Sequence, residues 1–153
     1  MMFKPGLDTL AAALPMGARL GFDLVQVSGI EDSITRFGPG FTARFFTRRE
    51  LAYADSGAGL KGPRLAARFA AKEAVIKALD LSEAGVDWRD IEVVKLPHGD
   101  CRLCLHRHVR AIAARMGASE LLLSLSHDGD YAGAVVTVLL AKPATKQPVE
   151  TLP

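Results

Sequence analysis

Residues 68–79 read Arg-Phe-Ala-Ala-Lys-Glu-Ala-Val-Ile-Lys-Ala-Leu, a run of small and apolar residues that carries three cations and one acid. Glu73 and Lys77 stand four positions apart and therefore share one face of a helix, while Arg68 and Lys72 share another. Such a helix offers an oxygen ligand for a hard cation, an ammonium group beside it, and further positive charge for phosphates. The plainer interpretation is a solvated salt bridge between Glu73 and Lys77. The many alanines around them favour close approach of a second element or a ligand.

The segments on either side of this helix alternate between helical and strand patterns, which predicts an α+β fold with a mainly antiparallel sheet. The sheet is expected to pack against one long and several short helices, the long one running from Pro63 to Leu79. Strands are expected at residues 19–27, 91–96, 101–105, 121–126 and 131–140, the last of them central because it is apolar throughout. Short helices are expected at residues 30–37, 47–54 and 108–116, with a break at Gly38-Pro39-Gly40. Thr47 and Glu50 fit a capping box.

Length and composition predict one domain, residues 19–140, preceded by an extension at 1–18 and followed by a tail at 141–153 that is expected to be disordered. The net charge of +2 is too small to predict nucleic-acid binding, and no apolar run is long enough to cross a bilayer. The two cysteines, Cys101 and Cys104, do not form a disulfide framework, so a reducing cytoplasm is expected.

Basic residues are concentrated in one third of the chain despite the small net charge. Solvated helix faces would explain them, as would a landing surface for phosphates or for an acidic partner protein. The cluster comprises Arg44, Arg48, Arg49, Lys61, Arg64, Arg68, Lys72 and Lys77.

Asp23 interrupts an apolar strand in the segment Gly21-Phe22-Asp23-Leu24-Val25. A carboxylate is costly to bury there unless it is paired or holds a metal ion. A position at the strand end or on an exposed face is the alternative. If Asp23 meets Glu73, the two would supply the one or two carboxylates that Mg²⁺ typically takes, leaving positions for phosphate and water.

Two histidine-containing segments invite metal-site interpretations. The pair His127-Asp128 suggests a metal phosphohydrolase, but that class needs further histidines and aspartates on helices, and the chain's other histidines lack that setting. The run Cys101-x-x-Cys104-x-His106-x-His108 resembles a zinc site. If residues 101–105 form a strand, however, the two cysteines point to opposite faces and cannot chelate one ion.

Four segments resemble, in the correct order, the motifs of the 4'-phosphopantetheinyl transferases of the short holo-acyl-carrier-protein synthase type. They are Gly21–Val27, Phe46–Ala52, Arg68–Leu79 and Ser124–Val136, and the resemblance extends over roughly residues 19–140. It implies transfer of the 4'-phosphopantetheine group from coenzyme A to a serine of an apo acyl carrier protein, with 3',5'-ADP released. The single half-length domain implies a homotrimer with sites between protomers.

The resemblance also implies residue roles. Asp23 and Glu73 would hold Mg²⁺, and Glu73 would help to remove the serine proton. Lys77 would stabilise or protonate the departing phosphate. Arg68 and Lys72 would bind phosphates of coenzyme A, and Ser126 and His127 would lie in the coenzyme pocket. The arginines near Arg44–Arg49 would dock the acidic carrier protein.

Three positions depart from the family pattern. The basic residue usual near Gly29 is absent, the Gly-(Lys/Arg)-Pro turn is Gly99-Asp100-Cys101, and a customary glycine is Arg107. These changes point to a specialised carrier protein or an altered coenzyme affinity. A non-catalytic module that binds coenzyme A or a carrier protein remains the alternative function, although it would have no need for Asp23, Glu73 and Lys77 together.

Overall fold

The computed structural model describes residues 17–141, so the predicted extension and tail lie almost entirely outside the described residues. The first half consists of one strand and four helices: β1 (Gly17–Gln26), α2 (Val27–Phe37), α3 (Pro39–Phe45), α4 (Arg48–Asp55) and α5 (Lys61–Ala78). The second half comprises η1 (Trp88–Asp90), β2 (Ile91–Lys95), β3 (Cys101–Leu105), α6 (Arg107–Arg115), β4 (Ala118–Asp128) and β5 (Tyr131–Leu140).

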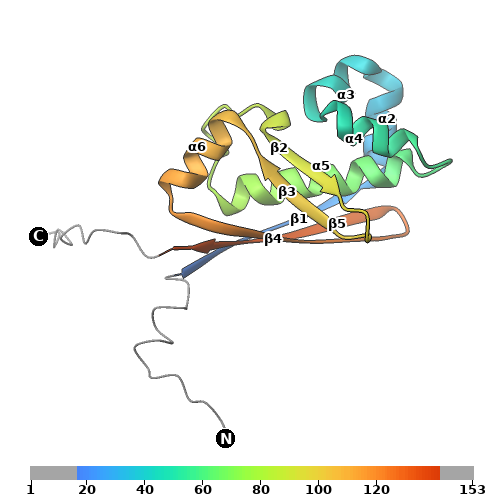
Figure 1. Cartoon of the computed structure of the whole chain (residues 1–153). Coiled ribbons are helices and arrows are strands. Elements are labelled where there is room, and N and C mark those ends of the chain that lie inside the picture. Colours follow the sequence, from blue (N-terminus) through green and yellow to red (C-terminus); the bar gives the residue numbers. More distant parts are fainter. Residues whose placement is uncertain (1–16, 142–153) are drawn as a thin grey trace, which may run out of the picture.

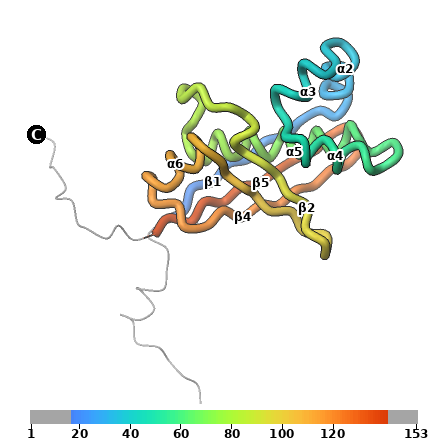
Figure 2. The backbone as a smooth tube through the Cα atoms, turned by 45° about the horizontal axis from the view of Figure 1, so that its top comes forward, coloured from blue at the N-terminus to red at the C-terminus, as the bar shows by residue number. Residues whose placement is uncertain are grey.

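The strands form two antiparallel sheets, which confirms the predicted α+β class. The larger sheet has the order β1-β5-β4 with the apolar β5 at its centre, as predicted, and the smaller one pairs β2 with β3. The long helix α5 lies along one face of the larger sheet (Figure 1). Helices α2, α3 and α4 gather at one end of the molecule and α6 lies at the other (Figure 2).

Small residues allow α5 to pack on several sides. Ala66, Ala70, Ala71 and Ala74 are fully buried. The main core lies between α5, the inward face of the larger sheet and the β2–β3 hairpin. Because these alanines keep the helix close to its neighbours, the positions of its charged residues are fixed by backbone packing as well as by their own contacts.

The outer face of the larger sheet is unusually apolar. Residues of β1 alternate between the two faces, so that Gly21, Asp23 and Val25 face α5 while Leu20, Phe22 and Leu24 are 67%, 55% and 58% exposed. The neighbouring strands add further exposed apolar side chains to this face: Leu122, Tyr131 and Val135. We call these six residues the outer apolar face.

The structure corrects two details of the predicted elements. The predicted break is confirmed at Gly38, whose φ of 61° ends α2 after Phe37, but no loop follows, because Pro39 begins the helix α3 at its first position, where proline needs no amide donor. Helix α5 begins at Lys61, so Pro63 is its third residue and not its first. The capping box at Thr47 and Glu50 is confirmed at the start of α4. Within the described residues no helix combines the length and apolar character needed to span a membrane.

Candidate active site

Asp23 is brought to α5 by the glycine that precedes it in the same strand. A side chain at Gly21 would overlap the backbone of Ala74, so glycine allows the helix to lie directly on β1. The ammonium group of Lys77 donates to Asp23 Oδ1 at 2.8 Å and to the carbonyl oxygen of Phe22 at 3.0 Å. Asp23 is thus paired within the fold, and its side chain is only 17% exposed.

Glu73 completes this group from one helical turn before Lys77. Burial raises the pKa of Glu73 above its usual value, the Asp23 carboxylate raises that pKa further, and Lys77 partly lowers it. The structure therefore brings Asp23, Glu73 and Lys77 together, and we call them the carboxylate group. Two carboxylates held close together repel each other, and a divalent cation between them would relieve that repulsion.

The donor set of the carboxylate group fits Mg²⁺ better than a softer ion. Two carboxylates and no nitrogen or sulfur ligand suit a hard cation that keeps positions for water and phosphate. Among residues 17–141 no cluster of three or more histidine, cysteine, aspartate or glutamate side chains is placed to hold a metal ion. Cys101 lies on the same side of β3 as Leu103 and Leu105, partly buried against the core, whereas Cys104 lies on the other side. The two cysteines therefore cannot chelate one ion.

A second group of predicted residues lines a cleft of about 320 Å³. Arg68, Ser126 and His127 meet there, together with Arg64 and Lys95, and no carboxylate lines it. Arg68 is only 3% exposed, and its Nε and Nη2 atoms have no hydrogen-bond partner among the described residues. Burial lowers the pKa of Arg68. A buried, incompletely satisfied guanidinium group is costly, and an anion in the cleft would satisfy it.

The two groups lie on different sides of α5. Arg68 precedes Glu73 by five residues and Lys77 by nine, which at the helical repeat turns these side chains roughly 140° and 180° away from it. Glu73 and Lys77 accordingly face the β1 side, while Arg68 faces Tyr53 of α4 and the cleft beside β4. A single chain therefore presents two separate halves of the predicted site.

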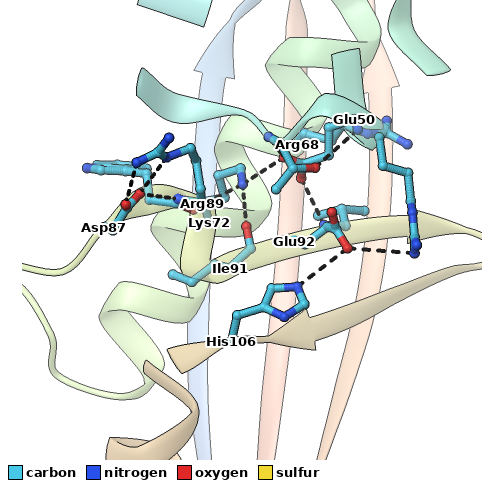
Figure 3. A network of polar contacts seen from close by, with 12 residues as sticks. Glu50, Arg68, Lys72, Asp87, Arg89, Ile91, Glu92 and His106 are labelled. Carbon is cyan, nitrogen blue, oxygen red and sulfur yellow. Dashed lines mark hydrogen bonds and ion pairs between the residues drawn. The ribbon is translucent and has the colours of Figure 1, made fainter. Parts of the chain in front are cut away.

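Lys72 does not have the position that a phosphate ligand needs. Its side chain is fully buried, its ammonium group lies 2.9 Å from Glu50 Oε2, and it donates to the carbonyl oxygens of Trp88 and Ile91 (Figure 3). Burial lowers the pKa of Lys72, and the Glu50 carboxylate opposes that shift. The expectation that Lys72 binds coenzyme phosphate is corrected: every donor direction points into the protein, and the residue ties α5 to α4 and β2.

Two residues of the cleft, Tyr53 and Lys95, were missed from the sequence, and Arg64 was named there only as a member of the basic cluster. The ring of Tyr53 lies 4.2 Å from the guanidinium carbon of Arg64 and 4.3 Å from that of Arg68, so one aromatic ring orients two cations. Lys95, at the end of β2, brings a third cation from a distant segment. Arg64 stands one helical turn before Arg68, and that spacing was the available signal.

The departures from the family pattern have different explanations. Arg107 adopts a left-handed φ of 41°, the region that glycine favours, and its guanidinium group bonds Asp90 and Asp87 at 2.6 and 3.2 Å. A side chain at Gly29 would meet only Gln26 Cβ, at 4.0 Å, so space does not require glycine there. Cys101 lies in the wall of the cleft.

Comparison with known proteins shows the family to which the chain is similar. The model of the 4'-phosphopantetheinyl transferase superfamily matches residues 19–136. The chain is 41% identical over 121 residues to the holo-[acyl-carrier-protein] synthase of Gloeobacter violaceus, covering 79% of this chain and 92% of that protein. It is 43% identical over 118 residues to the synthase of Moorella thermoacetica, covering 77% and 91%.

A solved structure shares the fold. The ACPS–CoA complex of Chronobacterium ammoniagenes has a TM-score of 0.73 at 34% identity, covering 82% of this chain and 99% of that one. The chain therefore belongs to the 4'-phosphopantetheinyl transferase superfamily. Within it, the relatives compared here are holo-acyl-carrier-protein synthases.

Proposed function

We propose that this protein transfers the 4'-phosphopantetheine group from coenzyme A to a serine of an apo acyl carrier protein and releases 3',5'-ADP. The observation that carries the proposal is the convergence of Asp23, Glu73 and Lys77 on one side of α5. A binding module would gain nothing from two close carboxylates, of which Glu73 has its pKa raised first by burial and then by Asp23. The relatives named as synthases and the coenzyme-bound structure support the same reaction.

The reaction is attack by a serine hydroxyl on the diphosphate of the coenzyme, which depends on charge stabilisation and positioning. Mg²⁺ held by Asp23 and Glu73 would supply positive charge to the diphosphate oxygens. Glu73, with its raised pKa, is suited to accept the serine proton. Lys77, half-exposed beside Asp23, is suited to stabilise or protonate the leaving phosphate. Arg68, Ser126 and His127 would bind the coenzyme in the cleft.

We further propose that complete sites form between protomers of a homotrimer. The carboxylate group and the cleft lie on different sides of α5, so a neighbouring copy would have to bring its cleft to the carboxylate group. The outer apolar face supplies the hydrophobic surface that such an assembly needs, because exposed apolar patches of this kind mark interaction sites.

The carrier protein is proposed to dock on the exposed arginines of α3 and α4. Arg44, Arg48 and Arg49 are all exposed, and an acidic partner would be attracted to them.

The cytoplasm is the proposed location of this protein, in keeping with the free thiols of Cys101 and Cys104. The phosphohydrolase alternative finds no support, because His127 and Asp128 belong to no larger ligand cluster among the described residues.

Intact-protein mass spectrometry tests the reaction. An apo acyl carrier protein is incubated with the full chain, coenzyme A and Mg²⁺, and in parallel with EDTA. We expect a gain of one phosphopantetheine mass that EDTA abolishes. Absence of any gain with several fatty-acid and polyketide carriers, combined with measurable binding of coenzyme A, would favour the binding module.

A further inference from the structure

Cys101 lies in the wall of the cleft. It is a half-buried free cysteine on β3, and it shares the cleft with Arg68, Ser126 and His127. Its thiol places a nucleophile at the space where the coenzyme is proposed to bind. Cys104 faces the other side of the strand and lines none of the clefts described here.

The cleft beside Cys101 is lined by cations and therefore favours anions, whereas a second hollow that Cys101 also lines contains Asp100 and Glu120. The proposed selectivity concerns approach through the cleft. The charged side chains of the cleft are Arg64, Arg68 and Lys95, with no carboxylate among the lining residues. Arg68 adds an independent indication of a ligand, because two of its nitrogen atoms are buried without a partner among the described residues. A concave surface with one sign of charge raises the local concentration of oppositely charged small molecules.

We propose that Cys101 is a thiolation site for small anionic disulfides and that the resulting mixed disulfide reversibly closes the cleft. In this exchange the Cys101 sulfur, after losing its proton to solvent, attacks one sulfur of the disulfide. The new bond joins Cys101 to that half, the original S–S bond breaks, and the other half leaves as a thiolate. A reducing thiol reverses the exchange, so the cysteine serves as a redox-sensitive brake.

Closure follows from the size of the cleft. Its volume of about 320 Å³ is at the lower end of the range for small-molecule sites, so a group attached to Cys101 would occupy space that the coenzyme needs. Inhibition of transfer rests on the proposed function, whereas selective thiolation rests only on the charges and position of Cys101. The two parts can therefore fail separately.

The experiment uses the full chain and the dianionic disulfide 5,5'-dithiobis(2-nitrobenzoate), with neutral 2,2'-dithiodipyridine as the comparison reagent. The Cys104→Ser variant reports Cys101, and the Cys101→Ser variant reports Cys104. For each cysteine, the labelling rate with the anionic reagent is divided by the labelling rate with the neutral reagent. We expect this ratio to be at least about tenfold higher for Cys101 than for Cys104. Equal ratios, or no labelling of Cys101, would overturn the proposal.

Transfer activity is measured on the same samples before labelling, after labelling and after dithiothreitol. In the Cys104→Ser variant we expect labelling to abolish transfer, dithiothreitol to restore it, and coenzyme A to slow labelling. Full transfer by protein labelled at Cys101 would overturn the closure of the cleft. Absence of transfer before labelling would instead contradict the proposed function, and the ratio of labelling rates would still decide whether Cys101 is an anion-selective thiol.

Discussion

Gly21 of β1 lies directly beneath the backbone of Ala74 in α5. A Cβ at position 21 would overlap the Ala74 carbonyl oxygen and lie 3.0 Å from the amide nitrogen of Ala78. Backbone atoms cannot move aside as a flexible side chain can, so the absence of a side chain at Gly21 sets the separation between strand and helix. That separation places Asp23 within 2.8 Å of Lys77.

The first prediction concerns this contact. Gly21→Ala should force α5 away from β1 and cost about 1–3 kcal/mol of folding stability, as overpacking usually does. The rate of phosphopantetheine transfer should also fall, because Asp23 moves relative to Glu73 and Lys77. Urea unfolding and the mass-spectrometric assay measure the two effects. Gly17→Ala is the matched control in the same strand, since a side chain there would meet only Leu140 Cδ1, at 3.9 Å. Similar behaviour of both variants would refute the role of Gly21.

The carboxylate group and the packing around it differ in how far they could be predicted. Asp23, Glu73 and Lys77 could be selected as candidate site residues because each stands within a short motif. The part played by Gly21 depends on its contact with Ala74, which comes more than fifty residues later in the chain. The same non-local cause explains Lys72, whose charge indicated a ligand but whose partner Glu50 belongs to another helix.

Local sequence signals predicted an element correctly where all the residues that determine it lie in one segment. The capping box requires only Thr47 and Glu50, and the centre of the sheet could be predicted from the continuous apolar run of β5. At Gly38-Pro39-Gly40 the composition was ambiguous, since proline both ends one helix and can begin the next. The spacing of the charged residues along α5 predicts two separate faces of the helix, but it does not predict which elements pack against each face.

The second prediction tests the carboxylate group. Glu73→Gln should lower transfer by roughly 10²–10⁴-fold, because it removes both a metal ligand and the proposed proton acceptor. Stability should hardly change, since within the described residues the Glu73 side chain is influenced by burial and by the charges of Asp23 and Lys77 and by no hydrogen bond that the substitution would break. Steady-state kinetics at several Mg²⁺ concentrations and a thermal unfolding curve measure both. Glu83→Gln, an exposed position outside the site, serves as the control. Undiminished turnover in Glu73→Gln would show that the site has been assigned to the wrong residues.

The third prediction separates the structural role of Lys72 from coenzyme binding. Lys72→Met leaves the buried Glu50 carboxylate without its cation and should cost about 3–5 kcal/mol of stability. The double variant Glu50→Gln/Lys72→Met should recover part of that loss, because no buried charge remains. Denaturant unfolding of the two variants measures the difference. If Lys72→Met kept its stability and only raised the KM for coenzyme A, the coenzyme role would have to be reinstated.

The fourth prediction concerns the outer apolar face. Phe22→Asp places a charge within this face and should convert the proposed trimer into monomers, with loss of transfer. Phe37→Asp is the matched control, since Phe37 is 59% exposed, close to the 55% of Phe22, but lies on α2. Light scattering after size-exclusion chromatography gives the mass of each variant. A wild-type protein that elutes as a monomer with full activity would exclude assembly as a requirement.

The fifth prediction asks whether complete sites lie between copies. Arg68→Gln and Glu73→Gln should each be inactive alone, the first through the cleft and the second through the carboxylate group. If each site takes its cleft from one protomer and its carboxylate group from the next, subunits exchanged at equal amounts give about one intact site in four. Mixed trimers should therefore regain up to about a quarter of wild-type transfer. Sites contained within single chains would regain none, because no protomer then carries both intact halves.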